Sequence, residues 1–198
     1  KNLESFFYKY KFQNIIHCAT DYGRGAKKSK LDIVNANLIL PLKLIELAIK
    51  FKVKTFINTD TFLPKDMSEY SLSKDHFYQW FKYYSKKITC INIKLEHFFG
   101  PGDNKTKFVI FIILKLIQKT KYINLTKGEQ KRDFIYIDDV IEALEKIILF
   151  SNKKKKGFYK FEIGTGKSIS IKNVVTYLAL FICSVTLFQS TTLKNALM

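Results

Sequence analysis

The sequence predicts an α/β protein with a parallel sheet covered by helices. Short runs rich in β-branched and aromatic residues alternate along the chain with longer stretches of helical periodicity. The first three of these runs are apolar enough to be strands buried on both faces. Strands that alternate with helices in this way form a parallel sheet with helices packed against it.

The predicted elements follow one another in chain order. The predicted strands are residues 13–19, 53–59, 88–95 and 157–164, and the predicted helices are residues 33–51, 69–86, 107–120 and 138–150. Pro41 interrupts the pattern of the first helix and should bend it or set its start. Pro101 predicts a turn after the third strand. Residues 174–188 are uncharged and largely apolar but shorter than a membrane-spanning helix, which predicts a buried helix and no membrane segment.

The net charge of +17 raises the question of a nucleic-acid partner. All but two of the 34 cationic residues are lysines spread over the chain, the exceptions being Arg24 and Arg132. Proteins that read nucleic acid specifically rely on arginine for bidentate contacts. We therefore interpret the charge as compositional bias and expect no nucleic-acid partner, while a basic nucleic-acid-binding protein stays as the third functional hypothesis.

The cysteines and histidines show no pattern of a disulfide framework or a metal site. The cysteines are Cys18, Cys90 and Cys183, and the histidines are His17, His76 and His97. The cysteines are few, far apart and odd in number, which is typical of a reducing compartment, so a cytoplasmic location is expected. The histidines lack the spacing of metal ligands, and no metal is expected.

The stretch "EYSLSKDHFYQWFKYY", residues 69–84, places Tyr70 and Lys74 one helical turn apart on the same face. By itself this pair is more simply the exposed start of an amphipathic helix than a catalytic pair. Ligands of parallel α/β sheets bind beyond the carboxyl ends of the strands. The residues there, in "CATDYGRG", "NTDT" and "KLEHFFGPGD", are therefore the candidates for a site.

Seven stretches, each weak alone, occur together in an order that is specific. They are "IIHCAT", "NANLILPLKLIELA", "VKTFINTDT", "YSLSK", "KLEHFFGPGD", "KRDFIYIDDV" and "FEIGTGKSISI". Together they resemble the NAD-dependent epimerase/dehydratase family, the extended short-chain dehydrogenases/reductases that act on nucleotide sugars. The resemblance covers about residues 13–175, and residues 176–198 are an unmatched tail. The motifs "NTDT", "KLEH" and "GEQKRDF" are most similar to the subgroup of CDP-paratose and CDP-abequose synthases.

The resemblance implies a Rossmann-like fold and an activity. The expected architecture is a doubly wound parallel sheet that lacks the first βαβ unit, with a partial substrate-binding lobe, in a single incomplete domain over residues 1–198. The expected activity is hydride transfer at C4 of a nucleotide-diphosphate sugar, as an epimerase or a 4-ketoreductase, with NAD or NADP as cofactor. A homodimer is the assembly considered for the full-length protein. The alternative is an inactive, truncated remnant that does not bind cofactor.

The resemblance also implies catalytic roles. Tyr70 would be the acid/base and Lys74 its electrostatic partner, which also binds the nicotinamide ribose. A free tyrosine has a pKa near 10, so catalysis at neutral pH requires a shift of roughly three units, about 4 kcal/mol. Thr61 matches the residue that hydrogen-bonds the reacting sugar oxygen, and Thr59, two residues earlier on the same strand face, is the alternative.

Binding roles are carried over in the same way. The residues matched to the cofactor site, besides Tyr70 and Lys74, are Cys18, Ala19, Thr20 and Asn37. Arg132 matches an arginine that grips the diphosphate of the sugar nucleotide, where its planar fork suits the geometry. Arg24, in "DYGRG", is a weaker candidate for substrate binding, with a surface role equally open.

Some residues depart from the family pattern. Phe62 and Leu63 stand where 4,6-dehydratases carry an Asp-Glu pair, so elimination of water is disfavoured. His97 replaces a common asparagine. The glycine-rich first turn and the acidic residue that reads the adenosine ribose would precede Lys1, and the chain is therefore expected to be a fragment.

Overall fold

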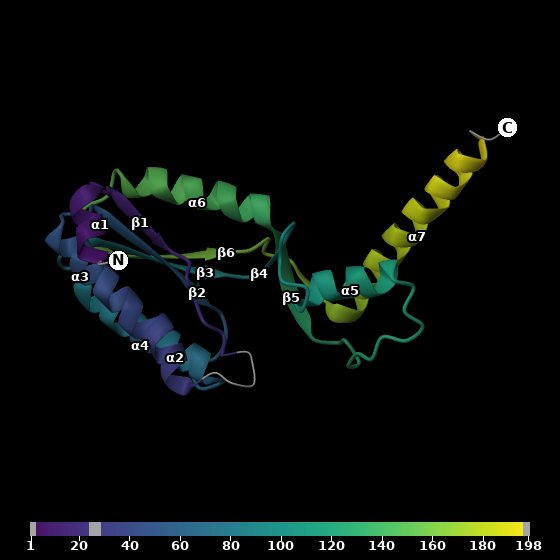
Figure 1. Ribbon diagram of the computed structural model, residues 1–198, viewed down its shortest axis with the longest axis horizontal. Coiled ribbons are helices and arrows are strands. Elements are labelled where there is room, and N and C mark those ends of the chain that lie inside the picture. Colours follow the sequence, from purple (N-terminus) through teal and green to yellow (C-terminus); the bar gives the residue numbers. More distant parts are fainter. Residues whose placement is uncertain (1–2, 24–28, 196–198) are drawn as a thin grey trace. The chain divides into compact units, whose positions relative to one another are not determined.

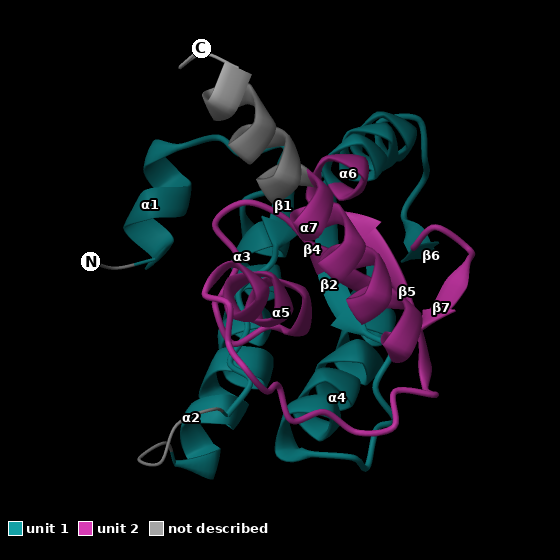
Figure 2. Cartoon of the chain, turned by 90° about the vertical axis from the view of Figure 1, so that its right-hand side faces the viewer, with its two compact units in different colours: residues 1–96, 141–163 teal, residues 97–140, 164–198 magenta. Residues whose placement is uncertain are grey.

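The computed structural model describes residues 3–23 and 29–195, and the side chains up to residue 184. The chain divides into two compact units, which Figure 2 shows in different colours. Unit 1 comprises Lys1–Glu96 and Ile141–Ile163, and unit 2 comprises His97–Val140 and Gly164–Met198. Arg24 lies outside the described residues.

Unit 1 is built on a parallel sheet of the strands β1 (Asn14–His17), β2 (Thr55–Thr61), β3 (Thr89–Leu95) and β6 (Gly157–Ile163), in the order β1-β2-β3-β6. These strands coincide with the predicted ones to within a few residues, and the predicted fold class is confirmed. In the middle of the sheet Asn58 pairs in register with His17 on one side and with Asn92 on the other. The carboxyl ends of all these strands therefore lie at one edge of the sheet.

Helices cover both faces of this sheet (Figure 1). The helices α3 (Leu40–Lys50) and α4 (Glu69–Tyr84) lie on one face, and α6 (Ile137–Ser151) lies on the other. On β6, Phe158 packs against Phe81 of α4, whereas Phe161 packs against Phe150 of α6. Side chains alternate between the faces of a strand, which explains this division.

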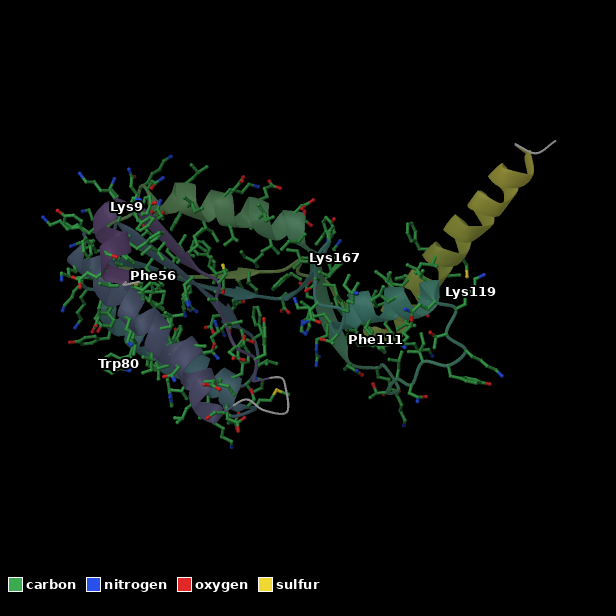
Figure 3. All side chains as sticks on the ribbon, viewed as in Figure 1. Lys9, Phe56, Trp80, Phe111, Lys119 and Lys167 are labelled. Atoms are coloured by element: carbon green, nitrogen blue, oxygen red, sulfur yellow. The ribbon has the colours of Figure 1, made fainter. Side chains whose placement is uncertain are left out.

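The core of unit 1 lies between the sheet and the α3–α4 layer. Its buried residues are Phe7, Ile45, Ala48, Val53, Phe56, Phe77, Phe81, Ile88 and Cys90. Phe7 belongs to α1 (Leu3–Lys9), a helix that the sequence patterns did not predict. Figure 3 labels Phe56 within this core and Trp80 on α4, whose side chain is about half exposed.

The first predicted helix forms as three consecutive segments. α2 (Lys30–Val34) passes into a π-helical turn, η1 (Asn35–Ile39), which continues into α3. The wider turn comes directly before Pro41, where the Leu40 amide donates to the Asn35 carbonyl. Proline has no N–H to donate, and its ring clashes with the carbonyl four residues earlier. The expectation that Pro41 perturbs this helix is confirmed, and the perturbation is a π turn.

Unit 2 contains a small mixed sheet and two helices. Its strands are β4 (His97–Phe99), β5 (Lys131–Tyr136) and β7 (Ser168–Ser170), with β5 parallel to β4 and antiparallel to β7. The patterns predicted none of these three strands, because each is short. A β-carbon at Gly100 would lie 2.3 Å from Ile137 Cγ2, so this close approach needs glycine.

The helices of unit 2 are α5 (Phe108–Ile117) and α7 (Ile171–Asn195), which pack against each other. The prediction of a helix over residues 174–188 is confirmed, but the prediction that it is buried is wrong for its described side chains. Tyr177, Leu180 and Phe181 are all exposed, because α5 covers only part of the helix surface. Within the described part of the chain, no helix combines the length and apolarity that crossing a membrane requires.

Candidate active site

The start of α4 brings Tyr70 and Lys74 to the sheet. Ser68 caps the helix: its backbone is extended, its side chain accepts from the Ser71 amide, and the Ser71 side chain accepts from the Ser68 amide. The capping fixes where the helix begins and so which residues face inward. Tyr70 is 8% exposed and Lys74 is 3% exposed. The interpretation of this pair as an exposed helix start is therefore wrong.

The Tyr70 hydroxyl lies among hydroxyl groups from two other segments. The side chains of Thr61, at the end of β2, and Thr20, in the loop after β1, lie close enough to this hydroxyl to favour its ionised form. The ring of Tyr22 packs against the Tyr70 ring at 4.9 Å between centroids. Burial raises the pKa of Tyr70 to about 12, with a further contribution from the Tyr22 phenol, while the neighbouring side chains of Thr61 and Thr20 oppose the shift. The phenol is therefore neutral at physiological pH.

Lys74 is held by the backbone of β2. Its Nζ donates to the Thr59 carbonyl oxygen at 2.8 Å. Burial lowers the pKa of the Lys74 ammonium, and the charge of Asp60 opposes this shift. The sequence argument expected Lys74, as the electrostatic partner, to lower the pKa of Tyr70. In this structure burial dominates, and the pKa of Tyr70 moves the other way.

The two candidate threonines make different contacts. The Thr61 hydroxyl lies beside Tyr70 and accepts from the Leu63 amide at 3.2 Å. The Thr59 hydroxyl donates to the His17 carbonyl at 3.2 Å and so ties β2 to β1. Thr61 is half-buried, whereas Thr59 is buried. The geometry favours Thr61 over Thr59 as the hydroxyl that meets a substrate.

Asn37 links the loop after β1 to both helices of the α3–α4 layer. Its Oδ1 accepts from the Thr20 hydroxyl at 3.1 Å and from the Asp21 amide at 2.8 Å. Its Nδ2 donates to the Asp21 carbonyl at 2.8 Å and to Ser73 Oγ at 3.1 Å. These four bonds use both donor hydrogens and both acceptor positions of the amide. Asn37 thereby fixes Thr20 relative to the helix that carries Tyr70.

Cys18 and Ala19, at the carboxyl end of β1, are exposed. The Cys18 side chain lies beside the Thr59 hydroxyl. Together with Thr20, they form the surface that borders the Tyr70 and Lys74 side chains in unit 1. The residues predicted from the first two strands and from α4 are thus brought together.

Arg132 belongs to unit 2, where it is an exposed residue of β5. Its Nη1 donates to the Lys131 carbonyl at 2.7 Å. The neighbouring Asp133 accepts from the Thr165 hydroxyl at 2.5 Å and from the Gly166 amide at 2.8 Å. Burial raises the pKa of Asp133, but these hydrogen bonds outweigh it and hold the pKa below its ordinary value. Arg24 lies outside the described residues, so its predicted role stays a prediction.

Sequence reasoning missed the polar side chains of β2 and β3 on the face toward α4. Asn58 and Asn92 are buried and hydrogen-bonded to each other, and Asp60 follows on the same face. A cavity of about 230 Å³ adjoins Asp60 and Asn92 beside α4. The available signal was the repeated pattern of "TFIN" and "TCIN", which pairs the two asparagines in register. Among the described residues, no three His, Cys, Asp or Glu side chains are grouped as metal ligands.

Comparison with known proteins identifies the family of the chain. The sequence profile of the NAD dependent epimerase/dehydratase family matches residues 1–164. The chain is 41% identical over 172 residues to CDP-abequose synthase from Salmonella typhimurium, covering 83% of this chain and 57% of that protein. It is 26% identical over 176 residues to CDP-abequose synthase from Yersinia pseudotuberculosis, covering 83% of this chain and 60% of that protein.

Solved structures show the same fold. MoeE5 in complex with UDP-glucose and NAD has a TM-score of 0.78 at 20% identity, covering 91% of this chain and 65% of that one. UDP-glucose 4-epimerase from Thermotoga maritima has a TM-score of 0.77 at 20% identity, covering 89% and 63%. The chain thus spans somewhat more than half the length of the curated relatives it matches. Both the family resemblance and the likeness to CDP-abequose synthases are confirmed, and the chain belongs to the NAD dependent epimerase/dehydratase family.

Proposed function

We propose that the protein transfers hydride at C4 of a CDP-activated sugar, with NAD or NADP as cofactor and Tyr70 as the proton carrier. The observation that carries the proposal is the convergence of Tyr70, Thr61 and Lys74 at the carboxyl edge of the sheet. The choice of CDP is supported by the relatives named CDP-abequose synthase. Reduction of a 4-keto sugar and epimerisation at C4 both use this set of groups.

The residues present fit one end of a dinucleotide cofactor. Exposed Cys18 and Ala19 allow close approach along the end of β1, and the buried Lys74 ammonium provides donors toward ribose hydroxyls. The cofactor, when bound, would supply or accept the hydride. No G-x-G-x-x-G run, the pattern of the turn that receives the pyrophosphate in such folds, occurs in these 198 residues, so the fit concerns the nicotinamide end alone.

The chain's own groups divide the remaining work. Thr61 would hydrogen-bond the C4 oxygen of the sugar and orient it toward Tyr70. Tyr70, neutral because burial raises its pKa, would donate its hydroxyl proton to that oxygen as negative charge develops there. Lys74, held by the Thr59 carbonyl, would stabilise the phenolate that remains. Asn37 would keep the loop carrying Thr20 in place beside the reacting groups.

The proposal is tested by Tyr70→Phe in the extended protein, meaning this chain continued at both ends to the length of its relatives. Turnover of a CDP-4-keto-6-deoxy sugar with NADPH or NADH should fall by about 10²–10⁴, because the proton carrier is lost while the ring still packs. Binding of the CDP-sugar, measured by isothermal titration, should persist.

The matched control is Tyr78→Phe, which removes a phenol hydroxyl from the same helix two turns later, on the wall of the neighbouring cavity. Its turnover should stay near that of the wild type. Wild-type turnover in Tyr70→Phe would refute the assignment of Tyr70.

A further inference from the structure

A row of buried polar side chains crosses the sheet of unit 1 on the face toward α4. His17 of β1, Asn58 of β2 and Asn92 of β3 stand opposite one another in register. His17 Nδ1 lies 3.1 Å from Asn58 Oδ1, Asn58 Nδ2 lies 2.9 Å from Asn92 Oδ1, and Asn92 Nδ2 lies 2.8 Å from Asp60 Oδ2. We call these four residues the polar row. The polar row ends at the carboxylate of Asp60, which stands between Thr59 and Thr61 in the sequence of β2.

The carboxylate fixes the direction of every hydrogen bond in the polar row. An ionised carboxylate only accepts, so Asn92 must donate its amide hydrogen to Asp60. Asn92 then accepts from Asn58 through its oxygen, and Asn58 accepts from the His17 ring in the same way. His17 is therefore the neutral tautomer with its hydrogen on Nδ1. Its Nε2 is left as a buried acceptor with no hydrogen-bond partner among the described residues.

The second oxygen of Asp60 binds the backbone of the strand that carries Thr59 and Thr61. Asp60 Oδ1 accepts from the Thr61 amide at 2.8 Å, and the residue before it, Thr59, provides the carbonyl that binds Lys74 Nζ. We propose that Asp60 is a positioning residue, aimed by Asn92, whose negative charge keeps Lys74 protonated in its buried position. The proposal deepens the proposed function, since it rests on Lys74 acting in that reaction as an ammonium ion.

The charged and titratable groups around Lys74 support this arrangement. Burial lowers the pKa of Lys74, while Asp60 on β2 and Cys18 after β1 raise it. His17 on β1 is the other titratable group coupled to Lys74: burial lowers the pKa of His17, and the Lys74 charge lowers it further. His17 is therefore neutral at neutral pH, and Asp60 is left as the main opposing charge.

The test follows the titration of Lys74 by NMR in the extended protein labelled with ¹³C-lysine, with the Lys74 signal assigned by its loss in Lys74→Arg. Asp60→Asn should move the Lys74 midpoint to lower pH, because the charge that favours the ammonium is removed. The matched control is Asp75→Asn. It removes a carboxylate that lines the same cavity but is paired with Lys65. Asp60→Glu keeps the charge and should retain a midpoint nearer to that of the wild type.

Two results would overturn the proposal: an unchanged Lys74 midpoint in Asp60→Asn, or equal shifts in Asp60→Asn and Asp75→Asn. The wild-type protein provides a measurement that does not depend on the folding of any variant. The ¹⁵N shifts of His17 at neutral pH should show a neutral ring with its hydrogen on Nδ1, and a hydrogen on Nε2 alone would overturn the direction of the polar row.

Activity gives a second, separable readout. The alkaline limb of the pH profile of kcat/KM should move to lower pH in Asp60→Asn and stay in place in Asp75→Asn. The NMR titrations need neither substrate nor cofactor, so they decide the role of Asp60 even where the extended protein proves inactive on CDP-sugars. If the Lys74 midpoint shifts but the pH profile of kcat/KM does not, the role of Asp60 is supported and the proposed function of Lys74 in the reaction is contradicted.

Discussion

Tyr70 and Lys74 lie one helical turn apart, yet the polar groups beside their side chains come from the strands and loops around them. Tyr70 meets Thr61 and Thr20, and Lys74 meets the Thr59 carbonyl. Because burial raises the pKa of Tyr70 to about 12, the phenol keeps its proton over the whole physiological range. A neutral phenol is the form that gives a proton to an oxygen gaining negative charge.

Arg132 gives a prediction that concerns substrate alone. In the extended protein, Arg132→Lys keeps the charge but loses the planar fork that grips a diphosphate, so CDP-sugar affinity should fall roughly tenfold to a hundredfold. Isothermal titration should show almost unchanged affinity for the cofactor. Lys131→Ala, which removes the neighbouring exposed cation of β5, is the control and should have a smaller effect. Equal losses of affinity for the CDP-sugar and for the cofactor would mean that Arg132 stabilises the folded structure and does not contact the substrate.

The residues that could be predicted from the sequence are those whose partners lie close along the chain or within a motif. Tyr70 and Lys74 are one turn apart in a capped helix, and Asn37 stands in a helix that its motif identifies. The polar row could not be found in this way, because its members come from different strands. Only the strand register places Asn58 against Asn92. The burial that decides the pKa of Tyr70 is likewise a property of the assembled unit.

The π turn η1 is the element that carries Asn37. Pro41 cannot donate to the carbonyl four residues earlier, which is that of Asn37 itself, and the helix widens there. The turn lets one asparagine reach both the loop after β1 and Ser73 of α4. Helical periodicity predicted a helix across this region and the position of its perturbation. It did not predict the wider turn, since periodicity does not distinguish π from α geometry over so few residues.

Asn37→Asp should destabilise the extended protein by about 1–3 kcal/mol, because two amide donors are lost while the acceptors remain. The Asp21 carbonyl and Ser73 Oγ would then lose their bonds from Nδ2. Urea unfolding measures the loss. Asn35→Asp is a matched control, the same change two residues earlier in the same turn but at an exposed side chain. Similar unfolding midpoints for the two variants would contradict the role of Asn37 as a link.

At the scale of the whole molecule, the sequence predicted the parallel sheet and its main helices, because buried strands and amphipathic helices leave strong patterns. It did not predict the short strands of unit 2, whose three to six residues carry almost no pattern. The chain corresponds to 57% of the length of its Salmonella relative. The activity, substrate and partners of the whole protein therefore stand as proposals.

The 198-residue chain by itself should not bind NAD(H) or NADP(H). In parallel α/β folds, the pyrophosphate rests on amides at a helix N-terminus that a glycine-rich turn brings close, and the sequence after the first strand, "GRGAKK", does not match the G-x-G-x-x-G pattern of that turn. The glycines of "FEIGTGKS" instead follow β6. Isothermal titration should give no heat of binding for the isolated chain and clear binding for the extended protein. Micromolar affinity in the isolated chain would contradict this expectation, and no binding by either protein would favour an inactive remnant.

The pairing of β2 with β3 also bears on how the sheet avoids misalignment as it forms. Both strands begin with threonine and carry isoleucine and then asparagine, so Thr55, Ile57 and Asn58 meet Thr89, Ile91 and Asn92. Apolar side chains alone would tolerate a slip of two residues, since the same faces would still be buried. That slip would leave the buried amides of Asn58 and Asn92 without each other, at the cost of unsatisfied polar groups. We expect the asparagine pair to favour this strand register over the other registers that the apolar side chains alone would allow.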